Sequence, residues 1–221
     1  MSLNPRRLAL VGAVALALGA PFAAPLIAQI AAKPGAADPA RVTGGTYTVD
    51  HEHTMVGWRL DHLGVTPYFG IFGQVTGTLD IDPKNPRATK VDVTIPVAKV
   101  TTASPGLTAH LLRPAAQAGG KPDFFGPAPA DARFVSTSVE PGEKAGTAKL
   151  TGNLTLNGVT KPVVLDVAFY GAAKMPKEMG GQDMIGFEAD ATIKRSDFGI
   201  STAIPLVSDE VQLDIVAAFV K

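Results

Sequence analysis

Apolar and polar side chains alternate with a period of two in several separate segments of the chain. Val56, Trp58 and Leu60, for example, alternate with Gly57 and Arg59. The segments that share this pattern are residues 56–60, 75–82, 91–97, 150–156, 163–169, 187–193 and 211–219. Because this period places successive side chains on opposite faces of a strand, each segment is predicted to be a β-strand with one apolar and one polar face.

Turn-forming residues separate these predicted strands. The strongest signal is Asn157-Gly158, because both residues accept the positive φ angles that a tight hairpin turn requires. Roughly seven to nine strands joined mostly by short turns, without alternating helices, predict an all-β antiparallel sandwich or barrel. We favour a barrel, because a closed sheet has no open edge.

Residues 103–133 interrupt the alternation. Leu107, His110 and Leu111 have helical spacing, and we expect a short helix from Leu107 to Arg113 that ends at Pro114. The loop that follows is rich in proline and glycine and contains the adjacent aromatic residues Phe124 and Phe125. Two interpretations remain open: these rings line the rim of a ligand site, or the loop plugs one end of the core.

The N-terminal segment is typical of a secretory signal. Arg6 and Arg7 precede an uncharged apolar run, and small residues and prolines follow up to Ala32. We expect a signal peptide at residues 1–32, a flexible linker at residues 33–44 and one domain at residues 45–221. The alternative is an uncleaved membrane anchor.

Composition excludes several classes of function. Removing residues 1–32 takes away two of the 20 basic residues and none of the 20 acidic ones, which leaves a net charge of −2. No electrostatic basis for binding nucleic acid remains. The absence of cysteine excludes both disulfides and thiolate chemistry.

Five groups of residues, in the same order along the chain, resemble the YceI-like family. They are Tyr47-x-Val49-Asp50-x-x-His53-Thr54 with Val56-x-Trp58-x-x-x-His62 and Gly70-x-Phe72; Asp123-Phe124-Phe125; Phe134-x-Ser136; Gly152-x-Leu154 to Val163; and Arg195 to Ile200. The family usually has Ser where this chain has Thr54. Residues 114–120 look like an insertion, and residues 126–129 replace a more polar stretch.

The resemblance implies a lipocalin-like antiparallel barrel of about eight strands with one short helix and a long lid-like loop. It further implies a periplasmic protein that carries or stores a polyisoprenoid lipid, an isoprenoid quinone or a prenyl phosphate, with no catalytic residues and no other cofactor. Transient membrane contact is compatible with such a role, and the sequence leaves open whether the chain is a homodimer. The expected ligand contacts are Trp58, His62, Phe69, Phe72, Phe124, Phe125, Phe134, Phe187, Phe198 and Arg195, and Asp50 and His53 are expected to form structural hydrogen bonds.

Two other classes of function stay in view. His51 and His53 lie two residues apart on a predicted strand, a spacing that presents two imidazoles to one zinc or copper ion, with His62 as a third ligand. This arrangement would make the protein a metal-dependent enzyme, although solvated or hydrogen-bonded histidines fit the same pattern. The other class is a ligand-free barrel, since an eight-stranded barrel is close to the size at which side chains fill the interior.

The role of Arg195 also has two interpretations. In a strand, Arg195 and Asp197 share one face, opposite Ser196 and Phe198. The two residues then form a surface pair or close a turn, or Arg195 faces an anionic prenyl-phosphate head.

Overall fold

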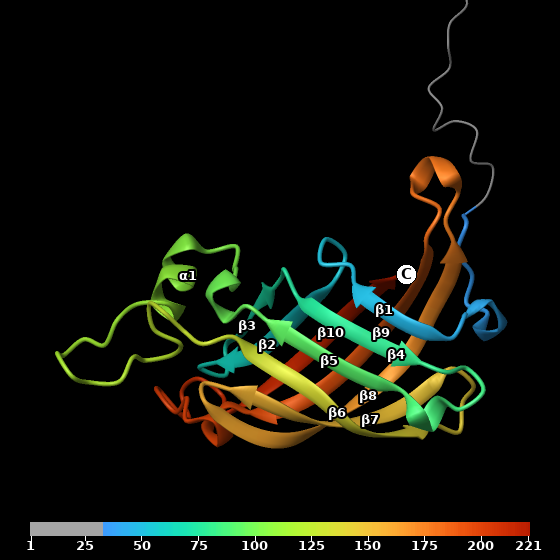
Figure 1. The fold of residues 1–221 in the computed structure, drawn as a ribbon. Coiled ribbons are helices and arrows are strands. Elements are labelled where there is room, and N and C mark those ends of the chain that lie inside the picture. The colour runs from blue at the N-terminus through green and yellow to red at the C-terminus, as the bar shows by residue number, and fades with distance from the viewer. Residues whose placement is uncertain (1–32) are drawn as a thin grey trace, which may run out of the picture. The chain divides into compact units, whose positions relative to one another are not determined.

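The sheet closes into a barrel where β1 (Gly45–Val49) pairs with β10 (Glu210–Val220) near the two ends of the domain (Figure 1). The computed structural model describes residues 33–221, so the predicted signal peptide lies outside the described residues. The sheet order is β1-β4-β5-β6-β7-β8-β9-β10-β2-β3, and every pairing is antiparallel. The predicted antiparallel barrel is therefore confirmed. The other strands are β2 (Met55–His62), β3 (Thr66–Phe72), β4 (Thr76–Ile81), β5 (Lys90–Ile95), β6 (Ala132–Pro141), β7 (Thr147–Leu156), β8 (Val159–Lys174) and β9 (Asp183–Lys194).

Two pairs of strands each act as one interrupted strand of the ring. β1 and β2 follow each other along the same edge of β10, where Val49 faces Phe219 and Met55 faces Val216. On the other side of this interrupted strand, β4 pairs with β1 and β3 pairs with β2. Counting each interrupted pair once makes the ten strands an eight-stranded barrel.

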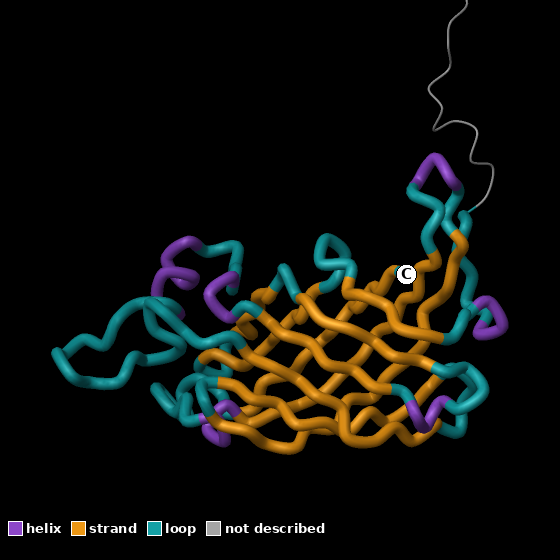
Figure 2. The backbone as a smooth tube through the Cα atoms, viewed as in Figure 1, coloured by secondary structure: helices purple, strands orange, loops and turns teal. Residues whose placement is uncertain are grey.

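The alternating pattern places apolar side chains inside the barrel. On β2, Trp58 is buried while its neighbour Arg59 is exposed. The predicted hairpin turn lies between β7 and β8, where Asn157 and Gly158 have φ angles of 52° and 75°. Both values lie in the left-handed region that a type I′ turn requires. Figure 2 shows strands making up the wall and loops gathered at its two ends.

One α-helix is present among the described residues. α1 (Pro105–Leu111) starts two residues before the predicted position, because Ser104 Oγ accepts a hydrogen bond from the Leu107 N–H and Pro105 occupies the first helical turn. No helix of the described residues is long and apolar enough to cross a bilayer. Short 3-10 helices lie in the connections: η2 (Pro39–Arg41), η3 (Pro86–Ala88), η4 (Val97–Lys99), η5 (Lys177–Met179) and η6 (Arg195–Phe198).

The segment that precedes β1 differs from a free tether. Ala36 pairs with Ala172 of β8 through two backbone hydrogen bonds of 3.1 and 3.0 Å. Thr43 Oγ1 donates to Asp183 Oδ2 at 2.9 Å. Residues 34–44 therefore contact the barrel wall instead of forming the flexible linker that their composition suggests.

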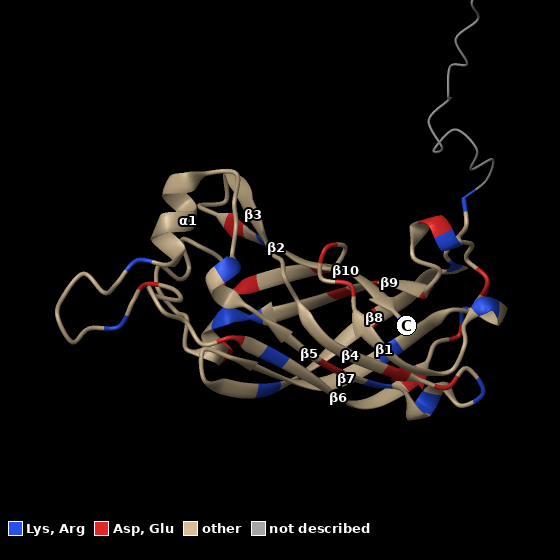
Figure 3. Ribbon diagram, turned by 45° about the horizontal axis from the view of Figure 1, so that its top comes forward, with Lys and Arg blue, Asp and Glu red and all other residues tan. Residues whose placement is uncertain are grey.

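The outside of the barrel carries charges of both signs. Figure 3 shows Lys and Arg interspersed with Asp and Glu over the strands and loops. This distribution agrees with the balanced composition of 20 basic and 20 acidic residues. A mixed surface of this kind favours solubility without a strong field of one sign.

Candidate functional site

Two adjoining apolar cavities lie inside the barrel. The first, which we call the helix-end cavity, has a volume of about 310 Å³ and is partly lined by α1. The second, the far cavity, has a volume of about 430 Å³. Both cavities share four lining residues, Val56, Ile95, Leu154 and Leu213. Side chains therefore do not fill the interior completely, contrary to one of the alternatives raised by the sequence.

Seven ring side chains line the helix-end cavity among aliphatic ones. Phe72 and Phe125 pack edge to face with ring centroids 5.8 Å apart, and His110 and Phe124 do the same at 5.3 Å. His62 and Tyr68, from β2 and β3, contribute two more rings 4.6 Å apart. The expected ligand contacts Trp58, His62, Phe72, Phe124, Phe125 and Arg195 all line this cavity.

Trp58 lies against the backbone of β3. It faces Gly70 in the β2–β3 ladder, and its side chain is 8% exposed. Its indole Nε1 is buried and has no hydrogen-bond partner among the described residues. A buried donor without an acceptor is destabilising, so this nitrogen is a candidate contact for a ligand.

Arg195 is 4% exposed at the start of η6. Its Nε, Nη1 and Nη2 donate to the carbonyl oxygens of Ser208, Ile200 and Val207 at 2.9, 3.0 and 2.8 Å. Burial lowers the pKa of this guanidinium, and the nearby Asp209 carboxylate acts in the opposite direction. The group stays protonated because the ordinary pKa of arginine is so high.

The shared face that a strand would give Arg195 and Asp197 does not occur. Residues 195–198 form the 3-10 helix η6, so these two residues do not share the face of a strand. Arg195 turns inward because three backbone carbonyls from residues 200–208 accept its hydrogen bonds. The carboxylate bound to the start of η6 is Asp209, which accepts from the Ser196 N–H and hydroxyl at 2.8 and 2.7 Å.

The lid-like loop, residues 112–131 between α1 and β6, is held against the end of α1. Asp123 accepts a hydrogen bond from Arg113 Nη2 and lies 3.1 Å from His110 Nε2, and both contacts lower the pKa of Asp123, the first more than the second. The Phe125 N–H donates to the Leu111 carbonyl at 3.0 Å. These contacts hold Phe124 and Phe125 against the cavity, so the loop covers one end of the barrel interior.

Four other expected ligand contacts lie outside the helix-end cavity. Phe134 and Phe187 line the far cavity. Phe69 does not face the interior: it is 68% exposed, because it alternates with Tyr68 and Gly70 along β3 and shares the outer face with Arg59. Phe198 is 1% exposed and lines neither cavity, because η6 turns it into the packed cluster around Leu150.

Sequence reasoning missed Tyr68 and the four residues that the two cavities share. Tyr68 lies on β3, whose sequence Thr66–Phe72 lacks a clear alternation. Leu154 and Leu213 lie in predicted strands, and the alternating pattern places them on the apolar face, which was the one signal in the sequence that they point into the barrel. Which inward residues border a cavity depends on the packing of strands that are distant in sequence.

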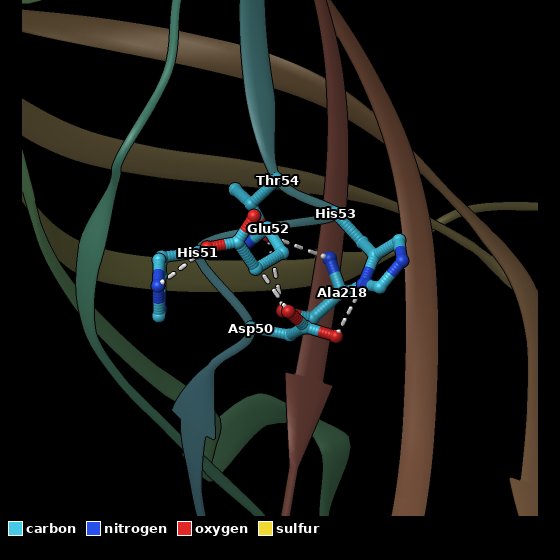
Figure 4. Close-up of polar contacts among 6 residues, drawn as sticks. All are labelled: Asp50, His51, Glu52, His53, Thr54 and Ala218. Atoms are coloured by element: carbon cyan, nitrogen blue, oxygen red, sulfur yellow. Dashed lines mark hydrogen bonds and ion pairs between the residues drawn. The ribbon is translucent and has the colours of Figure 1, made fainter.

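The strand geometry that the metal-site alternative requires is not present at His51 and His53. His51 and His53 lie in the turn between β1 and β2, so they do not share the face of a strand (Figure 4). His51 Nε2 lies 3.0 Å from Glu52 Oε1, and His53 Nδ1 lies 2.7 Å from Asp50 Oδ2. Residues 33–221 contain no group of three side chains placed to hold a metal ion. The proposed third ligand, His62, ends β2, which starts at Met55 just after this turn.

At the same turn, Thr54 supplies hydrogen bonds to β10 that the paired strands do not. Its hydroxyl donates to the Ala218 carbonyl at 3.1 Å and accepts from the Ala218 N–H at 3.0 Å. The Asp50 N–H also donates to the Ala218 carbonyl, at 2.9 Å. Between the end of β1 and the start of β2, these groups satisfy the backbone hydrogen bonds of β10. A serine at position 54, usual in the family, would supply the same hydroxyl.

Comparison with known proteins identifies relatives along most of the barrel. A family model described as a YceI-like domain matches residues 47–219. Protein YceI of Salmonella arizonae is 41% identical over 172 residues, which cover 76% of this chain and 83% of that protein. The same identity and coverage hold for Protein YceI of Salmonella enteritidis.

Solved structures share the fold. The Campylobacter jejuni YCEI protein is 32% identical, with a TM-score of 0.58 over 73% of this chain and 89% of that chain. Burkholderia cenocepacia BcnA is 24% identical, with a TM-score of 0.60 over 77% and 98% of the two chains. A polyisoprenoid binding domain from Saccharophagus degradans, implicated in plant cell wall breakdown, is 13% identical, with a TM-score of 0.54 over 78% and 97%. The last two similarities concern the fold alone.

Proposed function

The chain belongs to the YceI-like family, and on that premise we propose that it is a periplasmic carrier or store that binds one long isoprenoid lipid inside its barrel. The observation that carries the proposal is the pair of adjoining apolar cavities, of about 310 and 430 Å³. The Saccharophagus degradans neighbour, described as a polyisoprenoid binding domain, supports the same class of ligand.

The driving force for binding is the burial of the lipid tail. Each buried methylene-sized group contributes about 0.8 kcal/mol. The far cavity is lined mostly by Val, Leu, Ile and Phe, so a tail in it replaces water contacts by apolar ones. Partial enclosure of a long isoprenoid is then sufficient for stable binding.

The proposal is for binding without catalysis and without a cofactor besides the lipid. The residues that line the helix-end cavity include no carboxylate, and Arg195 uses three N–H groups on backbone carbonyls. The bases that line this cavity are His62 and His110, and its lining has no Ser, Thr or Cys as a nucleophile beside them and no carboxylate to complete a metal site. Export rests on the N-terminal pattern of Arg6, Arg7 and the apolar run that follows.

We propose that the lipid enters and leaves at the β2–β3 end, which contacts the membrane transiently. Large apolar side chains are exposed there on β3 and in two neighbouring loops: Leu63, Val65, Tyr68, Phe69, Ile71, Ile204 and Leu206. We call this set the apolar tip. The Leu63 N–H donates to the Leu206 carbonyl at 2.7 Å, which joins the two loops.

The position of the apolar tip favours a bilayer as its partner. His62 and Val207, the chain neighbours of Leu63 and Leu206, line the helix-end cavity, and so does Tyr68 itself. Outside the isolated bridge between Ile71 and Thr101, β3 pairs only with β2 in the described sheet. Large exposed apolar patches mark interaction sites, and a lipid that passes this end must exchange with a lipid surface.

Lipid extraction tests the proposed function. The full chain, expressed in a Gram-negative host, is recovered from the periplasmic fraction and purified without detergent, and native mass spectrometry precedes extraction. We expect about one isoprenoid per chain. Protein that is empty and that also takes up no isoprenoid added from vesicles would overturn the lipid-binding function, and retention of the chain in the cytoplasmic fraction would overturn the localisation.

A further inference from the structure

The far cavity reaches the surface of the protein at the end of the barrel opposite α1 (Figure 1). Six of its lining residues are also exposed to solvent: Pro39, Asp82, Pro83, Pro86, Pro141 and Gly146. They lie before β1, in the β4–β5 connection, and at the end of β6 or in the loop that follows it. Because these residues face both the cavity and the solvent, the far cavity has an opening of its own, which we call the far mouth.

The rim of the far mouth suits a hydrocarbon better than a charged head. Four of its six residues are prolines, which have no backbone N–H that contact with an apolar chain would leave unpaired. Asp82 is the one charged residue among those that line the far cavity, and its Oδ1 accepts a hydrogen bond from the Lys84 N–H at 2.9 Å. The far mouth is therefore suited to the tail of a lipid.

One side of the far mouth is formed by residues 34–44, which we call the strap. Pro39 and Val42 of the strap line the far cavity. Ala36 is hydrogen-bonded to β8 and Thr43 to β9, whereas the N–H groups of residues 40–42 donate within the strap itself. No residue of the strap is buried. A segment that is held at two points and buries little apolar surface opens at low cost, so this side of the far mouth can yield to a tail.

The length of the barrel gives the far mouth a use. β10 has 11 residues, and its inward side chains from Val211 to Phe219 line the two cavities in turn. With a rise of about 3.4 Å per residue and the usual strand tilt, the barrel interior is on the order of 30 Å long. A long isoprenoid tail exceeds this length when it is extended. In a barrel closed at the far end such a tail would have to fold back on itself.

Building on the proposed lipid-binding function, we propose that the barrel is a tunnel with a second opening at the far mouth, through which the end of an isoprenoid tail longer than the barrel interior passes to the surface beside the strap. The lipid still enters from the apolar tip, tail first. The barrel interior then sets no upper limit to the length of the tail.

The dependence of affinity on tail length tests the proposal. Polyprenols that share one head and differ in tail length, from shorter to longer than the barrel interior, are added to the delipidated full chain, and native mass spectrometry measures their affinities. We expect the affinity to rise with each added unit while the tail lies inside the barrel and then to level off, because a group beyond the far mouth is no longer buried. A barrel closed at the far end predicts that affinity falls for the longest tails.

The position of the tail end is measured separately. The same polyprenols carry an azide on the last carbon of the tail, and the reagent is a water-soluble strained alkyne that is too large to enter the barrel. We expect long tails to react while they are bound and short tails to stay protected until they are released.

A pair of neighbouring variants tests the place of the opening. Thr89 is half-buried and lines the far cavity, whereas Ala88 is exposed and lines neither cavity. We expect Thr89→Trp to narrow the far mouth and to weaken binding of the longest polyprenol by about tenfold, the effect of leaving roughly two methylene-sized groups unburied. The shortest polyprenol should bind as before. Ala88→Trp, the matched control, should leave both affinities unchanged.

The outcomes separate this proposal from the proposed function. Binding of no polyprenol of any length overturns the lipid-binding function itself. Loss of affinity beyond the length of the barrel interior, an azide that is protected at every tail length, or equal effects of the two tryptophan variants overturns the far mouth and leaves lipid binding intact. Circular dichroism checks the folding of both variants, and if Thr89→Trp does not fold, the azide reaction of the parent chain decides.

Discussion

Trp58 and Gly70 face each other across the β2–β3 ladder so closely that the indole ring takes the space of a side chain at position 70. A Cβ on Gly70 would lie 2.5 Å from Trp58 Cζ2 and 2.8 Å from the Thr101 carbonyl oxygen. Ordinary contacts between such atoms are near 3.5 Å. The glycine therefore fixes where the ring stands at the cavity wall.

Gly70→Ala should displace the indole ring. We expect the free energy of unfolding to fall by about 1–3 kcal/mol, as for other overpacked interiors, and the fluorescence maximum of Trp58 to shift. Gly73→Ala is the matched control, because a Cβ at Gly73 meets no atom within 4 Å. Urea denaturation followed by fluorescence measures both effects, and equal stability of the two variants would contradict the close approach.

Thr54→Val should destabilise the barrel closure. It removes the hydroxyl that bonds both backbone groups of Ala218, and Thr54 itself is 3% exposed. The Ala218 carbonyl keeps its hydrogen bond from the Asp50 N–H, so the valine variant leaves only the Ala218 N–H unpaired, which destabilises by about 1–3 kcal/mol. Thr54→Ser keeps the hydroxyl and should keep most of the stability in urea denaturation. If the valine variant is as stable as the serine variant, the hydroxyl does not hold β10 in place.

The fold was predictable because its signals are local. Alternation along β2 and β10, and the positive φ angles that Asn157-Gly158 accepts, are properties of neighbouring residues. The break between β1 and β2 was not predictable in the same way. His51 and His53 continue the spacing of a strand, and only the register of β10, with Phe219 facing Val49 and Val216 facing Met55, reveals the turn.

The candidate site was predictable in its aromatic content and not in its geometry. Phe124 and Phe125 stood out as adjacent rings in a loop, and both line the helix-end cavity. The role of Arg195 stayed open, because nothing near it in sequence reveals that carbonyls as distant as that of Ser208 would accept its hydrogen bonds. Phe69 was assigned to the interior as an aromatic residue, although the phase of β3 turns it outward.

The fastening of the lid-like loop should weaken in acid. Hydrogen bonds from Arg113 and, to a smaller extent, His110 hold the pKa of Asp123 below its ordinary value of 3.8. A lowered pKa in the folded state means that the carboxylate stabilises the fold fully above about pH 4 and loses this effect as the pH falls through the lowered value. Asp123→Asn should therefore be less stable than the parent chain at pH 7, and the difference should shrink as the pH is lowered below 4, in urea denaturation across this range. A difference that is independent of pH would contradict the role of this carboxylate.

The apolar tip should control how fast lipid is exchanged rather than how tightly it is bound. Phe69 is 68% exposed and lines neither cavity, so Phe69→Ser leaves the binding site unchanged while removing a large ring from the apolar tip. We expect transfer of an isoprenoid quinone from donor to acceptor vesicles to slow by about tenfold, because an exposed ring contributes on the order of 1–2 kcal/mol to contact with a bilayer. The equilibrium affinity should stay within twofold.

Tyr170→Ser is the matched control for this experiment. Tyr170 is 69% exposed, almost the same as Phe69, but it lies on β8 and belongs to neither cavity nor the apolar tip. If the bilayer meets the barrel at the apolar tip, only the Phe69 variant slows transfer. Equal slowing by both variants would mean that exposed rings assist transfer wherever they lie, and unchanged transfer by both would place the exchange route at another part of the barrel. The pair therefore separates a defined membrane-contacting end from a general effect of surface hydrophobicity.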